Sequence, residues 1–376
     1  MTQKYNFIDI FSGAGGMSLG LKQAGFNKVF SCDYKLDCVK TIGLNFPKVP
    51  SIHCDIRELS NEKILSLIGK KKIHLVAGGP PCQGFSTIGK GDPKDIRNNL
   101  FKEFVRVVKL TEPEFVLFEN VTGLLSRKNE KTFNAIVKSF SVLGYKMQVK
   151  VVQTQKFGVP QKRRRAILVG MKEGRNFSYP EETHDIEIGR KYVRPQNLGD
   201  VLKKIVGKRE RDLNHDLEST QIKSKMDRER LKRIPEGCSI RYQKDEKKFL
   251  TKKLSLGVNW DEIREGRLRE NHYHRLSRNL PTPTINTHNH HYYHPVELRK
   301  FTLREFALMQ SFPLSYKFYG SRTSIVRQIG NAVPPLLAKR LGESILCALR
   351  SKKSVRKSKY SSKSDFEKLR SEAFVY

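Results

Sequence analysis

The residues of this chain best suited to chemistry begin with a cysteine that follows an apolar run. Cys82 stands in the segment GGPPCQGFS over residues 78–86, directly after the apolar residues 73–77. The run is typical of a buried parallel strand, and the glycines and prolines end it, so we expect Cys82 on a stiff loop at a strand's carboxyl end. A cysteine alone is more often a small buried hydrophobe. The flanking Pro-Pro and Gln-Gly favour a nucleophile, which must be held rigidly and approached closely by its substrate.

An acid is expected near the same place, and a cluster of arginines follows later in the chain. Glu119 follows the apolar run 114–118, which should reach the same sheet edge as Cys82. A glutamate here is compatible with an ordinary solvated strand end. Beside a thiol, however, a carboxylic acid with a raised pKa is the partner that nucleophilic attack on a heteroaromatic ring requires. The basic segment QKRRR follows at residues 161–165.

Strands and helices alternate through the first 170 residues and must position these side chains. Apolar runs predict strands at 4–11, 28–32, 51–54, 73–77, 114–118, 145–153 and 166–170, and helical spacing predicts helices at 17–24, 98–110 and 129–143. This alternation predicts an α/β fold with a doubly wound, mostly parallel sheet. Two further helices are expected, one opened by Thr302 with Glu305 at the capping-box position, and one from Pro334 to about Arg350.

A nucleoside cofactor is predicted at the first two strand ends. The glycine run over residues 12–16 separates a strand from a helix, an arrangement that lets a ligand approach the backbone closely. Asp33 lies 20 positions after Gly13, where nucleotide-binding α/β domains carry the acceptor for ribose hydroxyls, and Asp55 follows the third strand. A GxxxxGK[ST] motif is absent, which disfavours a triphosphate. S-adenosylmethionine therefore fits best.

The charge of the chain indicates a polyanionic partner. Its 376 residues carry 72 Lys and Arg against 38 Asp and Glu, a formal net charge of +34. Lysine-rich codon usage would contribute, but an excess of this size favours nucleic acid. No apolar stretch resembles a membrane span or secretory signal, and no basic amphipathic helix suggests a membrane surface. The six cysteines form no CxxC pair, which disfavours disulfides and structural zinc and favours a cytoplasmic location.

Six motifs in order give the chain a resemblance to a known family. FSGAGG, PPCQGFS, ENV, QKRRR, RNLPTPTI and RQIGNAVPP resemble those of the DNA (cytosine-5)-methyltransferases, particularly the bacterial restriction-modification type. The resemblance covers all but residues 171–271 and the segment after residue 349. Pro80 departs from the family pattern, in which many members have an aromatic or small residue before Pro-Cys.

The resemblance implies a role for each matching residue. Cys82 matches the nucleophile, Glu119 the acid that contacts the target cytosine, and Arg163 and Arg165 the arginines of the active site. The implied contacts of S-adenosylmethionine are Phe11, Gly13, Ala14 and Gly16 on the methionine side, Asp33, Tyr34, Asp55 and Ile56 around the ribose and adenine, and Pro81, Leu100, Asn331 and Val333 as further lining. No metal is implied.

The implied chemistry explains these residue types. Carbon 5 of cytosine is a poor nucleophile, so the thiolate of Cys82 adds to carbon 6 while Glu119 protonates ring nitrogen 3. Carbon 5 then takes the methyl group, and loss of its proton and of the thiolate gives 5-methylcytosine. Arg165 suits the cytosine carbonyl and Arg163 the orientation of Glu119 or the thiolate, although the sequence does not separate these roles. The base must be flipped out of the duplex, and residues 86–97, with Gly89 and Gly91 as hinges, are expected to close over it.

The chain is expected to divide into a catalytic and a recognition part. Residues 1–170 and 325–350 would form the Rossmann-like catalytic domain, 171–324 a smaller, irregular target-recognition domain, and 351–376 a flexible basic tail. Within the second part, Arg241, Tyr242, Lys244 and residues 257–260 are candidates for contacts with the DNA groove. The histidine-rich residues 286–294 lack an acidic or cysteine partner at ligand spacing, so a metal site is not predicted there.

Other functions compete with this interpretation. A cytosine-5 methyltransferase acting on RNA shares the motifs, but the long basic insert favours duplex DNA. An amino-group methyltransferase would have no use for the thiol, and a catalytically silent DNA-binding protein would not need Cys82, Glu119 and two arginines. We expect a monomeric enzyme that acts on double-stranded DNA beside a cognate restriction endonuclease.

Overall fold

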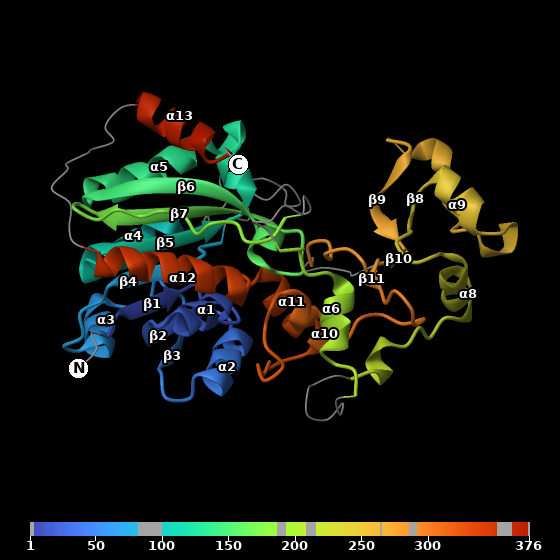
Figure 1. The fold of residues 1–376 in the computed structure, drawn as a ribbon, viewed down its shortest axis with the longest axis horizontal. Helices are drawn as coiled ribbons and strands as arrows, with labels where there is room; N and C mark the ends of the chain where they lie inside the picture. Colours follow the sequence, from blue (N-terminus) through green and yellow to red (C-terminus); the bar gives the residue numbers. More distant parts are fainter. Residues whose placement is uncertain are drawn as a thin grey trace.

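The fold has a large lobe built on one sheet and a smaller, irregular lobe (Figure 1). The structure is a computed structural model. It describes residues 4–81, 100–185, 193–207, 216–263, 265–285, 292–351 and 363–374. Cys82, the hinge segment 86–97 and most of the histidine-rich segment 286–294 lie outside the described residues.

A seven-stranded sheet forms the centre of the large lobe. Its order is β3-β2-β1-β4-β5-β7-β6, in which β3 to β5 run parallel and β7 runs antiparallel to both of its neighbours. The strands are β1 (Asn6–Ile10), β2 (Asn27–Asp33), β3 (Ser51–His53), β4 (Leu75–Gly78), β5 (Phe115–Asn120), β6 (Tyr145–Gln153) and β7 (Arg164–Lys172). β1, β4 and β5 are buried along their whole length, as expected of central strands covered on both faces. The predicted doubly wound, mostly parallel sheet is confirmed.

Helices cover both faces of this sheet (Figure 1). They are α1 (Gly16–Ala24), α2 (Leu36–Asn45), α3 (Asn61–Ile68), α4 (Leu100–Thr111), α5 (Glu130–Val142) and α12 (Pro335–Arg350). One face packs with α3, α4 and α5, and the other with α1 and α12. A Cβ atom on Gly20 of α1 would lie 2.3 Å from the Pro335 carbonyl oxygen, so glycine permits the close approach of α1 to α12. The predicted return of the helix after Pro334 to the first part of the chain is thus observed.

The smaller lobe has short elements and a small core. It contains α8 (Lys225–Arg233), α9 (Gln243–Phe249), the antiparallel pair β8 (Ile240–Tyr242) and β9 (Arg267–His272), and the parallel pair β10 (His274–Arg275) and β11 (Tyr292–Tyr293). Short 3-10 turns occur at Thr122–Leu125, Arg127–Asn129, Thr154–Phe157, Glu218–Thr220, Lys252–Leu254 and Trp260–Glu262 across the chain. The core of this lobe, as far as its residues are described, is Leu231, Ile234, Ile240, Leu250, Tyr273 and Tyr293.

Three helices lie between the two lobes and pack on the sheet side. They are α6 (Leu198–Lys203), α10 (Leu303–Met309) and α11 (Arg322–Asn331), and their apolar side chains share one cluster with Ala14, Ile42 and Phe46. The expected boundary after residue 324 therefore falls inside a single hydrophobic cluster. The capping box predicted for α10 is confirmed, because the Thr302 hydroxyl accepts from the Glu305 N–H and the Glu305 carboxylate accepts from the Thr302 N–H.

The tail expected to be flexible contains a docked helix. α13 (Lys363–Glu372) lies over α5 and β6 in Figure 1, with Leu369 and Ala373 buried in the sheet core. The N–H of Val151 on the edge strand β6 donates to the Ala373 carbonyl at 2.7 Å, and Arg370 pairs with Glu130 at 3.0 Å. The expectation of a flexible tail is wrong for residues 363–374, because buried apolar residues, a backbone hydrogen bond and an ion pair dock this helix on the sheet lobe. Across the described part of the chain, no helix has both the length and the apolar character needed to cross a membrane.

Candidate active site

Glu119 and Arg165 form an ion pair at the carboxyl end of β5. Glu119 is the fifth residue of β5, and Arg165 lies near the start of the antiparallel β7, so the two strand ends bring them together. The Arg165 Nε lies 2.9 Å from the Glu119 Oε1, and both side chains are largely buried. Burial lowers the pKa of Arg165, and the Glu119 carboxylate opposes that shift. The pair therefore keeps the Glu119 carboxyl group in one orientation.

The segment that leads into Cys82 starts against this acid. A Cβ atom on Gly79 would lie 2.8 Å from the Glu119 Oε2, so only a residue without a side chain fits there unchanged. The side-chain amide of Asn120 donates to the Pro80 carbonyl at 3.3 Å. Pro81, the last described residue before Cys82, is partly exposed. The structure thus places Glu119 and Arg165 beside the beginning of the predicted nucleophile loop.

Arg163 is a buried cation without a hydrogen-bond partner among the described residues. Its side chain is 1% exposed, and none of its three guanidinium nitrogens meets an acceptor in that part of the chain. Burial holds its pKa well below the usual value, the nearby Arg165 lowers it further, and Glu119 acts in the opposite direction. Burying an unpaired guanidinium is costly, so such a group in a site is a candidate for binding an anionic or carbonyl ligand.

Two sequence motifs clamp the backbone that carries these arginines. Gln161 forms a bridge with Thr282, whose N–H and hydroxyl both donate to the Pro160 carbonyl at 3.0 Å. The Lys162 N–H donates in turn to the Thr282 carbonyl at 2.7 Å. The QKRRR and RNLPTPTI segments, more than a hundred residues apart, therefore lie side by side.

A glycine turn and Asp33 form the predicted cofactor edge. The Asp33 carboxylate accepts from the Gly13 N–H at 2.7 Å and from the Lys35 N–H at 2.9 Å. Burial raises the pKa of Asp33, and the two N–H groups oppose the rise. Phe11 adopts a left-handed φ of 57°, which is uncommon for a residue with a side chain and typical of functional turns. The N-cap residue of α1 is Gly15, which has no side chain to cap the first turn, and the start of a helix attracts a carboxylate.

The remaining predicted cofactor residues separate into two groups. Ile56 is buried, and Phe11 and Leu100 are partly buried against the same core cluster. Val333 is buried close to α1, because a Cβ atom on Gly16 would lie 2.2 Å from its carbonyl oxygen. Tyr34 and Asn331, in contrast, are exposed.

Asp55 already has a partner within the chain. Its two carboxylate oxygens accept from the Arg57 guanidinium at 3.0 and 2.6 Å, and the Arg57 side chain lowers the pKa of Asp55. Arg57 is exposed and Asp55 is partly exposed, and the pair lies in the turn that follows β3. Any adenine contact by Asp55 would therefore be shared with Arg57.

Asp9 and Tyr316 were not expected at this edge. Asp9 is buried on β1, where its Oδ2 accepts from the Ser18 hydroxyl at 2.6 Å and its Oδ1 has no partner among the described residues. Burial raises its pKa to about 6. The Tyr316 hydroxyl donates to the Ala14 carbonyl at 2.5 Å and so holds the backbone of the glycine turn. The position of Asp9 inside an apolar strand could have indicated a functional acid. No local sequence pattern indicated that Tyr316 would contact the glycine turn.

The predicted groove contacts surround a cavity in the smaller lobe. It has a volume of about 520 Å³ and is lined by Cys238, Ser239, Arg241, Tyr242, Lys244, Asp245, Lys248, Phe249 and Asn271. The Nε of Arg241 and the Oδ1 of Asn271 are buried without partners in the described chain. Trp260, in contrast, donates its indole N–H to the Glu246 carboxylate, which gives the predicted segment 257–260 a structural role.

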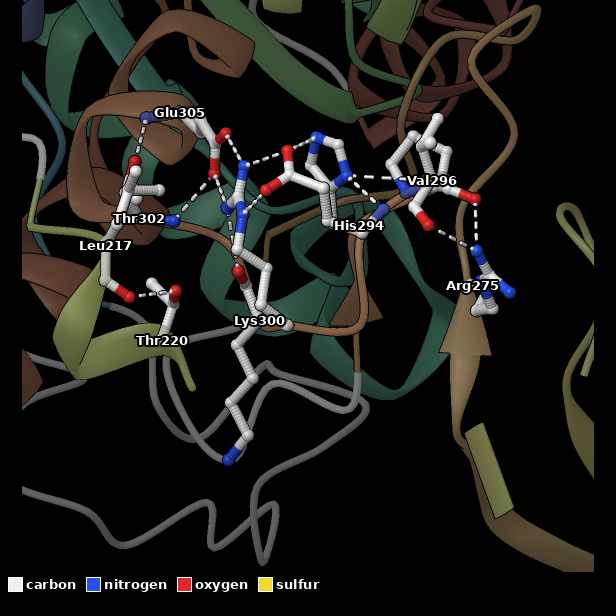
Figure 2. Close-up of polar contacts among 11 residues, drawn as sticks. Leu217, Thr220, Arg275, His294, Val296, Lys300, Thr302 and Glu305 are labelled. Atoms are coloured by element: carbon white, nitrogen blue, oxygen red, sulfur yellow. Dashed lines mark hydrogen bonds and ion pairs between the residues drawn. The ribbon is translucent and has the colours of Figure 1, made fainter. Parts of the chain in front are cut away.

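His294 belongs to a polar network at the junction of the lobes (Figure 2). Its Nδ1 accepts from the N–H groups of Val296 and Glu297 at 3.3 and 3.0 Å, and burial lowers its pKa to about 4. Beside it, the buried Arg299 is paired with Glu305 at 2.7 Å and with Glu297 at 2.9 Å. The ring nitrogen of His294 thus organises a turn of the backbone.

Comparison with known proteins agrees with this geometry. The family model of the C-5 cytosine-specific DNA methylases matches residues 5–347. The chain is 36% identical over 349 residues to the type II methyltransferase M1.HphI of Haemophilus parahaemolyticus, covering 90% of this chain and 86% of that protein. It is 32% identical over 377 residues to M.DdeI of Desulfomicrobium norvegicum, covering 90% and 88%.

Solved structures share the fold. A prophage-encoded E. coli protein described as a DNA modification methyltransferase superposes with a TM-score of 0.70 at 25% identity, covering 93% of this chain and all of that one. The DNMT2 of Spodoptera frugiperda superposes with a TM-score of 0.61 at 18% identity over 91% of this chain and all of that one, a likeness of fold alone. These matches confirm the resemblance carried by the six motifs. The chain belongs to the C-5 cytosine-specific DNA methylase family.

Proposed function

We propose that this DNA (cytosine-5)-methyltransferase is the modification enzyme of a type II restriction-modification system, with Cys82 as its nucleophile. The names of its relatives support the first part. The observation that carries the second is the meeting of three segments at one sheet edge. Glu119 is paired with Arg165, and Gly79, three residues before Cys82, lies against the same carboxylate.

The two arginines take separate roles in this proposal. Arg165 orients Glu119, because it makes the ion pair with that carboxylate. Arg163 is assigned to the thiolate of Cys82, since a buried cation favours the ionised form of a neighbouring thiol. The thiolate adds to carbon 6 of the flipped cytosine while Glu119 protonates ring nitrogen 3. Once carbon 5 is methylated, its proton leaves and the carbon–sulfur bond to Cys82 breaks.

The residues of the cofactor edge fit S-adenosylmethionine. The uncapped start of α1 suits the carboxylate of its methionine part, and Asp33 retains lone pairs for the ribose hydroxyls beyond its two N–H partners. The apolar Phe11, Ile56 and Leu100 border the same edge and suit an adenine ring. When bound, the cofactor supplies an electrophilic methyl group on a sulfonium.

We assign sequence recognition to the smaller lobe, residues 216–298. Its cavity carries Arg241, Lys244 and Lys248, whose charges suit DNA. The Nε of Arg241 and the Oδ1 of Asn271 lack partners in the described chain. Arginine and asparagine are side chains that read guanine and adenine edges in the major groove. The remaining basic surface supplies affinity for phosphates without sequence information. The enzyme would act on chromosomal DNA in the cytoplasm.

Covalent trapping tests the assignment of Cys82. Duplex DNA with 5-fluorocytosine at the target position cannot lose its carbon-5 substituent as a proton, so the wild-type enzyme should remain attached through Cys82. Cys82→Ser should form no such complex and transfer no methyl group, while it still binds S-adenosylmethionine in calorimetry. Cys347→Ser, which changes an exposed cysteine on α12, should be trapped like the wild type. A covalent complex formed by Cys82→Ser would overturn the assignment.

A further inference from the structure

Two cysteines lie in contact at the strand ends that carry the cofactor acids. Cys32 directly precedes Asp33 at the end of β2, and Cys54 directly precedes Asp55 after β3. Their sulfur atoms are 3.4 Å apart, and the Cys32 thiol also lies 3.7 Å from the Cys54 carbonyl oxygen. The parallel register of the two strands pairs Cys32 with Ile52, and the Cys54 N–H donates to the Asp33 carbonyl at 3.3 Å. The pair is therefore held by backbone contacts on both sides.

The two thiols differ in access. Cys32 is 2% exposed, whereas Cys54 is partly exposed. Burial raises the pKa of both groups, so each is a protonated thiol at neutral pH, and access rather than thiolate character decides which of the two meets an oxidant first. The methyl-transfer chemistry uses neither group.

We propose that Cys32 and Cys54 form an oxidation site that controls the cofactor edge. A peroxide would oxidise the more exposed Cys54 first, forming a sulfur–oxygen bond to a sulfenic acid and releasing one molecule of water. The Cys32 thiol would then attack this sulfur, forming the sulfur–sulfur bond as the sulfur–oxygen bond breaks and a second water leaves. Two thiols lose two electrons, and the peroxide gains them. Reduction by a dithiol would reverse the change.

Closing the bond would move the acids that follow the two cysteines. The sulfur atoms must approach by about 1.4 Å to reach the length of a disulfide. β2 is a buried inner strand of the sheet, whereas β3 is a three-residue edge strand, so most of the movement falls on Cys54 and the turn that carries Asp55 and Ile56. The inference rests on the proposed binding of S-adenosylmethionine at this edge. Oxidation should then weaken cofactor binding.

The test measures the cross-link and cofactor binding separately. The reduced full-length protein is treated with increasing hydrogen peroxide, alkylated, digested and examined by mass spectrometry for a peptide joined through Cys32 and Cys54. Calorimetry with S-adenosylmethionine is performed on the reduced, oxidised and dithiothreitol-restored protein. We expect the dissociation constant to rise about tenfold on oxidation, the effect of displacing one buried polar partner, and to return on reduction. Cys54→Ser and Cys32→Ala should resist this change, and Cys347→Ser should behave like the wild type.

Each outcome decides one part of the inference. Oxidation of Cys347 or Cys82 without a joined Cys32–Cys54 peptide overturns the oxidation site. A joined peptide with unchanged affinity overturns control of the cofactor edge. Control is also overturned if peroxide lowers the affinity of Cys54→Ser as much as that of the wild type. If the reduced wild type fails to bind S-adenosylmethionine, the proposed cofactor site is wrong, whereas the peptide measurement still tests the thiol pair.

Discussion

The sheet edge that carries Glu119 and the smaller lobe, which we propose as the recognition lobe, are held in place by different means. Glu119 and Asp33 stand at the ends of strands that are buried in a seven-stranded sheet, so backbone ladders determine where they lie. The recognition lobe has strands of two to six residues and depends on arginines that bond to carbonyl groups. Arg275, for example, donates to the carbonyls of Ile234 and Pro295 at 3.1 and 2.7 Å. Backbone hydrogen bonds thus fix the side chains at the sheet edge, whereas side-chain contacts hold the short elements of the smaller lobe.

The sharpest test of this contrast removes the acid at the sheet edge. Glu119→Gln keeps the size of the side chain but cannot supply the proton to ring nitrogen 3, so we expect the methylation rate to fall about a thousandfold, or about 4 kcal/mol. Cofactor affinity should stay near wild type. Glu112→Gln changes an exposed glutamate and serves as the control. Single-turnover methylation of duplex DNA measures the effect, and a loss below tenfold would remove Glu119 from the chemical step.

The second test breaks the ion pairs at the junction of the lobes. Arg299→Met leaves the buried Glu305 without its partner, which should lower the free energy of unfolding by about 3 kcal/mol, as expected for half of a buried pair. Arg278→Met removes an exposed partner of Glu236 and should leave stability unchanged within error. Urea unfolding followed by fluorescence of Trp260 reports on the recognition lobe. Equal midpoints for the two variants would show that the junction does not depend on the buried network.

The smallest effect concerns the buried acid under the glycine turn. The pKa of Asp9 is raised to about 6 by burial, above its value in the unfolded chain, so its contribution to stability is fully present below pH 4 and is lost as the pH rises through about 6. Asp9→Asn removes this loss and should raise stability by roughly 2 kcal/mol at pH 8 relative to the wild type. The difference should shrink towards pH 4. Thermal unfolding at both pH values measures it, and a pH-independent difference would contradict the assignment.

The sequence predicted the sheet edge well because local periodicity controls it. The strand predicted at 145–153 coincides with β6. The sequence did not separate the roles of the two arginines and favoured Arg163 for the orientation of Glu119, whereas Arg165 makes the ion pair. The contact of Tyr316 with Ala14 joins residues 302 positions apart, and no local pattern encodes it. α13 was not predicted because its stretch is rich in lysine and serine, and the buried residues that dock it, Leu369 and Ala373, form no apolar periodicity long enough to indicate a helix. The roles of Cys82 and of the base-reading residues stay predictions.

α12 packs on α1 and the sheet, although it is synthesised long after them during translation. α12 buries Leu337, Leu341 and Ile345 against the face of the sheet that includes Phe7 and Leu75. The chain therefore makes the sheet first and the whole recognition lobe next, and only afterwards the helix that shields this face. Until residues 335–350 emerge, a nascent molecule carries an open apolar surface, the kind of surface that chaperones bind and that promotes aggregation. The position of the smaller lobe in the chain, before α12, thus lengthens the interval during which this face of the sheet stays uncovered.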